Sequence, residues 1–134
     1  MVPFKNQVFR VQTLDPARLP GRSFILHGGR IHKRADFFQA AAELFCFPYG
    51  CEDSLDALVD WMTDLSWFPD EQINVVIDNA EEFLSEDRGL RKTVTDIFAE
   101  DILPFWESEV ENVTVEGKAK RFDLYLVKET VQAR

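Results

Sequence analysis

The chain has 134 residues, of which 46% are hydrophobic, and its 24 acidic and 15 basic residues leave a net charge of -9. That length fits one domain whose core needs no disulfide or metal, and the 12 Phe and 3 Trp argue against a disordered chain. Nucleic acid and anionic lipid both repel a surface of this sign. The composition therefore favours a basic protein as the partner.

No apolar run reaches the roughly 20 residues of a membrane-spanning helix, and residues 1–13 lack the apolar core of a signal peptide. We therefore expect a cytoplasmic protein with no membrane partner. In that reducing compartment Cys46 and Cys51 are expected to remain free thiols. His27 and His32 lie apart from the cysteines and form no metal-binding pattern with them, so no metal or cofactor is predicted.

The first elements in chain order are a weak strand and a strong one. Residues 1–22 alternate weakly in polarity and contain two proline turns, so we expect an N-terminal arm or edge strand ahead of a domain spanning residues 23–134. Residues 23–27 form a compact apolar run that ends at Gly28-Gly29. This pattern is typical of a buried strand followed by a tight turn.

Two helices are predicted next. The first covers about residues 36–46, where Asp36 begins a capping-box pattern and apolar residues follow at helical spacing. The second covers about residues 52–66 and can be capped by Ser54 or Asp53.

A second buried strand is predicted at residues 73–78, which are apolar and β-branched. A strand, two helices and a strand make a crossover, so these two strands are expected to be parallel. Helical segments are expected near residues 81–84 and over residues 90–102. Pro104 should kink or end the second of these, which residues 105–111 can continue, and a third strand is expected at residues 122–127. The predicted fold is α/β, with a three-stranded, mostly parallel sheet flanked by about four helices.

The helix predicted at residues 52–66 carries two incompatible faces. Its apolar stripe consists of Leu55, Leu58, Val59, Met62 and Leu65. Its opposite side consists of Asp53, Asp56, Asp60 and Asp64. Asp is a mediocre helix former, and like charges one turn apart cost roughly 0.2 to 0.5 kcal/mol per pair. Helix stability alone therefore does not favour this arrangement.

The acidic helix lies in a longer stretch of one charge sign. Between residues 35 and 87 the chain has fourteen acidic residues and no Lys or Arg. A field of one sign attracts and holds a partner of the other sign. An acidic surface without a partner, serving solubility alone, is the alternative interpretation of the charge.

A motif occurs within this acidic region. The pattern consists of the turn at Gly28, Ile31, Asp36, Phe47-Pro48, and Leu55-Asp56-Ala57-Leu58 followed by Asp60. With it, residues 24–69 resemble the barstar family, which are cytoplasmic protein inhibitors of secreted ribonucleases. The resemblance implies that Asp60 occupies the substrate-phosphate position in the ribonuclease active site and that Asp56 accompanies it. A ribonuclease site presents cations for phosphate, and a carboxylate on a preorganised helix satisfies them without being cleaved.

The resemblance and the acidic face of the helix together define the rest of the predicted interface. The predicted target-binding residues are Asp56, Asp60, Ser54, Asp53, Gly50, Tyr49, Val59, Asp64, Trp61 and Glu100. The chain departs from the family pattern at Gly50, where a loop aromatic is common, at Ser54, where the family has Asn, and at Val59, where it has Trp. Either the aromatic contacts come from Tyr49, Trp61 or Trp67, or these side chains pack within the fold.

Three functions follow from these observations. The first is one-to-one inhibition of a small basic ribonuclease. The second is inhibition of a toxin other than a ribonuclease by the same scaffold. The third is an enzyme that uses Asp56 and Asp60 as paired carboxylates. The third is disfavoured because catalytic carboxylates need a concave, partly dry site, whereas these are predicted on a convex, exposed helix face.

Overall fold

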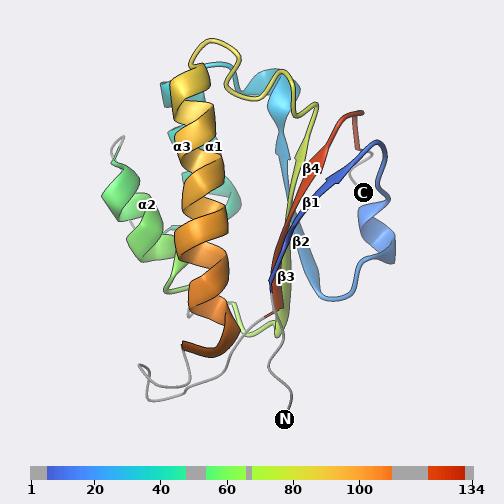
Figure 1. Cartoon of the computed structure of the whole chain (residues 1–134), viewed down its shortest axis with the longest axis vertical. Helices are drawn as coiled ribbons and strands as arrows, with labels where there is room; N and C mark the ends of the chain where they lie inside the picture. Colours follow the sequence, from blue (N-terminus) through green and yellow to red (C-terminus); the bar gives the residue numbers. More distant parts are fainter. Residues whose placement is uncertain (1–5, 48–53, 66–67, 110–120, 132–134) are drawn as a thin grey trace.

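The computed structural model describes residues 6–47, 54–65, 68–109 and 121–131. These residues form one sheet in which every neighbouring pair of strands is parallel, in the order β1-β4-β3-β2. The strands are β1 (Val8–Val11), β2 (Arg22–His27), β3 (Gln72–Asp78) and β4 (Arg121–Val127). The helices α1 (Arg34–Leu44), α2 (Leu55–Met62) and α3 (Arg88–Ile97) all lie on one side of this sheet (Figure 1).

The prediction of an α/β fold with a parallel sheet is confirmed. Two helices, α1 and α2, lie in the connection between β2 and β3, and Ile25 of β2 pairs with Val76 of β3 in parallel register. The central strand β3 is buried from Ile73 to Asp78. A strand buried on both faces reads as a continuous apolar run, which is why its sequence pattern was clear.

The prediction of three strands is wrong, because β1 forms a fourth strand at the edge of the sheet. Val8 of β1 pairs with Leu124 of β4, and Val11 pairs with Val127. β1 is only four residues long. The sequence predicts an arm or an edge strand at residues 1–22, and pairing with β4, a strand near the other end of the chain, makes residues 8–11 an edge strand.

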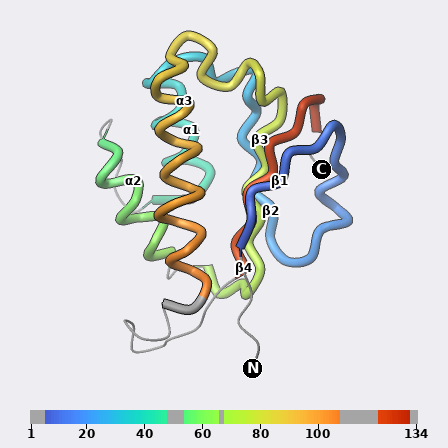
Figure 2. The backbone as a smooth tube through the Cα atoms, in the orientation of Figure 1, coloured from blue at the N-terminus to red at the C-terminus, as the bar shows by residue number. Residues whose placement is uncertain are grey.

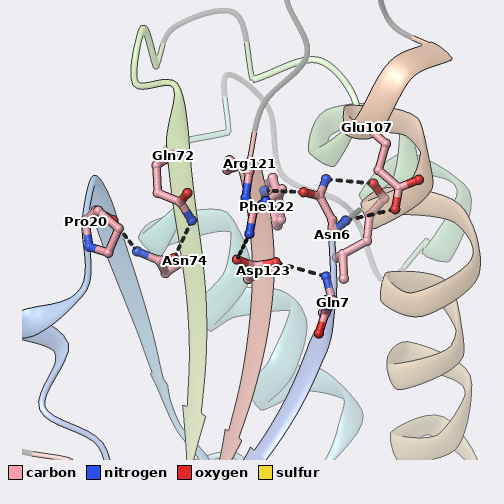
Figure 3. Close-up of polar contacts among 10 residues, drawn as sticks. Asn6, Gln7, Pro20, Gln72, Asn74, Glu107, Arg121, Phe122 and Asp123 are labelled. Atoms are coloured by element: carbon pink, nitrogen blue, oxygen red, sulfur yellow. Dashed lines mark hydrogen bonds and ion pairs between the residues drawn. The ribbon is translucent and has the colours of Figure 1, made fainter. Parts of the chain in front are cut away.

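Buried side chains hold the start of β1 against β4 and the long helix (Figure 3). The Asn6 amide donates to the carbonyl oxygen of Leu103 at 3.0 Å and accepts from the N–H of Phe122 at 3.0 Å. The backbone N–H of Gln7 donates to Oδ1 of buried Asp123 at 2.9 Å. The edge strand is therefore fixed by side chains as well as by its backbone ladder.

The first helix begins earlier than predicted. α1 starts at Arg34, and Asp36 lies in its first turn rather than at its cap. The Asp36 carboxylate accepts hydrogen bonds from the backbone N–H groups of His32 and Lys33, at 3.1 and 3.2 Å. These bonds lower the pKa of Asp36, because they favour its charged form.

Residues 81–84 form turns, so the helix predicted there is wrong, and the described residues contain three α-helices rather than about four. Leu84 has a positive φ of 53°, which no α-helix tolerates. Its N–H donates to the carbonyl of Ile31 at 2.7 Å, and the N–H of Glu86 donates to the carbonyl of His32 at 2.9 Å. Backbone groups that a helix would use are thus paired with the loop after β2.

The long helix does not end at Pro104. After α3 the chain continues as two π-helical segments, η3 (Phe98–Ile102) and η4 (Phe105–Glu109). The N–H of Leu103 bonds to the carbonyl of Phe98, five residues earlier, which is the π spacing. Wider turns on both sides of Pro104 accommodate a residue that has no N–H to donate.

The sheet packs on both of its faces. On the helix side a large core includes buried Phe37, Leu58, Val75 and Phe98. On the other side the connection from β1 to β2 crosses the sheet, which Figure 2 shows as the blue segment on the side opposite the helices. Its Leu14 and Leu19 pack against a smaller cluster of buried residues, Val76, Val127 and Val131.

Buried Asp78, at the carboxyl end of β3, joins the end of β2 to the segment after β4. Oδ1 of Asp78 accepts from the N–H of Gly28 at 3.1 Å, and its Oδ2 accepts from the N–H of Val131 at 2.9 Å and lies 2.9 Å from Nδ1 of His27. Gly28 approaches the Asp78 backbone so closely that a side chain would not fit. This approach explains the glycine turn that the sequence predicted after β2.

Candidate functional site

The candidate site is built on α2. Ser54 is its cap: its Oγ accepts from the N–H of Ala57 at 3.2 Å. The helix is shorter than predicted, ending at Met62, and Leu65 has a positive φ of 44° that turns the chain away. The hydroxyl of Thr63 donates to the carbonyl of Val59 at 2.7 Å and satisfies one of the last carbonyl groups of the helix.

One face of α2 is anchored in the core. Leu58, Met62 and Leu65 are buried, and Leu55 and Val59 are half-buried. These five residues are the apolar stripe that the helical spacing predicted, and the full burial of Leu58, Met62 and Leu65 contributes about 1.5 to 3 kcal/mol for each side chain.

The indole of Trp106, in η4, fixes the end of α2. Its Nε1–H donates to the carbonyl oxygen of Met62 at 2.9 Å, and both residues are buried. This bond also satisfies a carbonyl at the helix terminus, where none of the last carbonyls has an intrahelical partner. Together with the apolar face, it sets the direction in which the other face of α2 points.

The opposite face of α2 and its continuation are acidic and exposed. Asp56, Asp60 and Asp64 are all exposed. Among the residues that the structure describes, none forms a hydrogen bond or an ion pair with these carboxylates. Asp56 lies in the first turn, where the helix dipole favours an anion, whereas Asp60 lies in the second half, where it does not.

Trp61 belongs to a column of aromatic rings beside this face. Its ring stacks on Phe47 with centroids 6.2 Å apart, and Phe47 stacks on Phe45 at 5.9 Å. Phe45 is buried, while Phe47 and Trp61 are half-buried. Trp61 therefore packs within the fold and also keeps part of its surface open to solvent. Sequence reasoning identified Trp61 but missed Phe47 as its support.

The other predicted site residues divide into two groups. Asp53, Gly50, Tyr49 and Trp67 lie outside the residues that the structure describes, as does Cys51. Glu100 is exposed on η3, a segment that contacts α2, and its membership of the target-binding surface stays a prediction. Cys46 is an exposed free thiol.

Two classes of site find no support in the described part of the chain. No group of three or more His, Cys, Asp or Glu side chains there is placed to hold a metal ion. None of the helices there is long and apolar enough to cross a membrane.

Comparison with known families gives one result. Residues 22–118 match the family model described as Barstar (barnase inhibitor), which covers well over half of the chain. The match includes every predicted target-binding residue and leaves β1 and β4 outside it. The chain matched no curated protein and no solved structure.

Proposed function

The chain belongs to the barstar family, and from this we propose that it inhibits a small, basic, secreted ribonuclease by covering the active site with the acidic face of α2. The observation that carries the proposal is that the carboxylates of Asp56 and Asp60 are exposed and find no partner among the described residues. Acids retained in this state are available to an external cation.

Asp60 is the residue that replaces substrate phosphate, and Asp56 supports it one turn away. A ribonuclease binds phosphate with Arg, Lys and His side chains, which a carboxylate can pair with through charge-assisted hydrogen bonds. Because the apolar face of α2 and the Trp106 bond hold the helix, little conformational freedom is lost on binding. The complex is one to one, and the inhibitor acts in the cytoplasm of the cell that makes the enzyme.

The experiment is a titration of RNA cleavage by a panel of small secreted ribonucleases with the purified protein. We expect stoichiometric loss of cleavage for at least one enzyme. Asp60→Asn should abolish tight inhibition, because it removes the charge and leaves the cations of the enzyme unpaired. Glu71→Gln is the matched control, since Glu71 is exposed in the same acidic region but lies outside α2.

The panel also separates the alternatives. If Asp64→Asn weakened inhibition more than Asp60→Asn, the assignment within α2 would be wrong. If no enzyme of the panel were bound or inhibited, the ribonuclease would be the wrong target. A toxin of another class, inhibited by the same scaffold, would then be the better candidate.

A further inference from the structure

A hollow of about 540 Å³ lies on another part of the molecule, between α3 and the strands β1 and β4. Arg10 of β1 pairs in register with Leu126 of β4, and both line the hollow. From the helix come Arg88, Arg91 and Lys92. In Figure 1, α2 and β1 lie on opposite sides of α3, so this hollow is separate from the acidic face of α2.

The lining of the hollow has the opposite charge to the whole chain. It contains four cationic side chains and two acidic ones, Glu81 and Asp96, whereas the chain has a net charge of -9. A smaller hollow beside it shares Arg10 and adds Lys128. A concave surface lined mainly by one sign of charge focuses the field on its centre.

The cations of the hollow are unequally satisfied. Lys92 pairs with Asp96 at 2.6 Å, and Arg91 donates to the carbonyl oxygen of Glu81 at 3.0 Å. The side chains of Arg10 and Arg88 are exposed, and neither guanidinium group forms a hydrogen bond or an ion pair with any residue that the structure describes. Two guanidinium groups facing one hollow without oxygen partners can bind the oxygens of an anion bidentately.

The position of the hollow fits a ligand site. It is bordered by residues at the carboxyl ends of the parallel strands, including Ala80, which follows β3, and Leu126 near the end of β4. In open parallel α/β sheets, ligands bind outside these ends.

We propose that this hollow binds a small, multiply charged anion of the phosphate class, with pyrophosphate as the simplest member. Arg10 and Arg88 contact its oxygens from the strand and from the helix. The guanidinium fork matches phosphate geometry, which is why phosphate is preferred over a simple halide. A long polyanion such as RNA is disfavoured, because the negative charge of the rest of the molecule repels it.

The test is calorimetric titration of the full chain with sodium pyrophosphate at low ionic strength. We expect saturable binding of one anion per chain. Arg10→Gln and Arg88→Gln should each weaken the affinity roughly tenfold, because each removes charged hydrogen bonds. Arg30→Gln is the matched control, since Arg30 is an exposed arginine outside the hollow, and it should leave the affinity unchanged within about twofold.

Amide NMR spectra of the wild-type chain locate the site without relying on a variant. Pyrophosphate should shift the signals of Arg10, Ala80 and Arg91, while Asp56 and Asp60 stay in place. Equal weakening by all three Arg variants would show diffuse attraction to positive charge and overturn the proposal. Failure of the folded chain to bind pyrophosphate, or tighter binding of a short RNA, would overturn it as well. None of these results bears on ribonuclease inhibition, which depends on α2.

Discussion

At the scale of single residues, the exposed acids of α2 differ from the buried acids of the sheet. Asp78 and Asp123 are buried and accept backbone N–H groups, so they are part of the structure. The carboxylates of Asp56 and Asp60 are exposed and accept no N–H group from the described residues. A carboxylate that does nothing for its own fold can be removed without harm to that fold, and this difference can be measured.

Asp60→Ala is expected to raise the free energy of unfolding of the isolated protein by roughly 0.5 to 1 kcal/mol. The substitution removes repulsion from Asp56 and Asp64, removes an anion from the unfavourable half of the helix dipole, and introduces the best helix former. Urea unfolding of the wild type and the variant, without any partner present, measures this change in the free energy of unfolding. A lower midpoint would mean that Asp60 has a structural role.

The lowered pKa of Asp36 leads to a prediction about how stability depends on pH. Its pKa is lowered by the backbone N–H groups of His32 and Lys33, so its contribution to stability is fully present above the unfolded value of about 3.9 and is lost as pH falls through the lower folded value. Urea midpoints of the wild type should therefore fall more steeply below about pH 4 than those of Asp36→Asn. Parallel curves for the two proteins would contradict this.

At the scale of elements, α2 is held from two directions. Its apolar face packs on the core, and its last turn is bonded by the indole of Trp106 from η4. The helix spans only 8 residues, which is too short to be stable alone, so its order depends on these contacts. The rigidity of the acidic face is thus a property of the neighbouring elements.

Trp106→Phe is expected to loosen α2 while keeping most of the apolar packing. The variant leaves the Met62 carbonyl without its donor, which should lower the free energy of unfolding by about 1 to 3 kcal/mol. Hydrogen exchange should become faster at the amides of α2 than at those of β3, whose ladder is untouched. Uniform protection changes across both elements would show that Trp106 supports the whole core and not this helix.

At the scale of the whole molecule, charge is divided between regions. Residues 35–87 hold fourteen acids and no Lys or Arg, whereas the cations around the α3 hollow come from residues before and after this stretch. The acidic side dominates the net charge of -9 and therefore the field at a distance.

Association with a basic ribonuclease is expected to be fast at low salt and to slow steeply as salt rises. At roughly 0.5 M salt the Debye length is only a few ångströms, so long-range attraction is screened. Stopped-flow measurement of the association rate at several salt concentrations checks this. A rate that stays constant up to that concentration would show that the acidic field plays no part in the encounter.

Elements with a complete local pattern could be predicted from the sequence. The strands at residues 23–27 and 73–78, the crossover between them, and the apolar stripe of α2 follow from periodicity and turn residues, although only alternate residues of the first strand are buried. The motif from Leu55 to Asp60 led to the family that the comparison then showed. These features depend on neighbours in the chain, which the sequence contains.

Only the tertiary structure decided the remaining features, because their partners are distant in the chain. β1 is a strand because β4 is beside it, and η4 supplies the bond that holds α2. Residues 81–84 are turns, and the N–H of Leu84 donates to the loop after β2. Arg10 and Arg88 likewise meet only through the sheet. A sequence pattern records the preference of each segment alone, whereas these features are set by hydrogen bonds and contacts that exist only after the segments have packed.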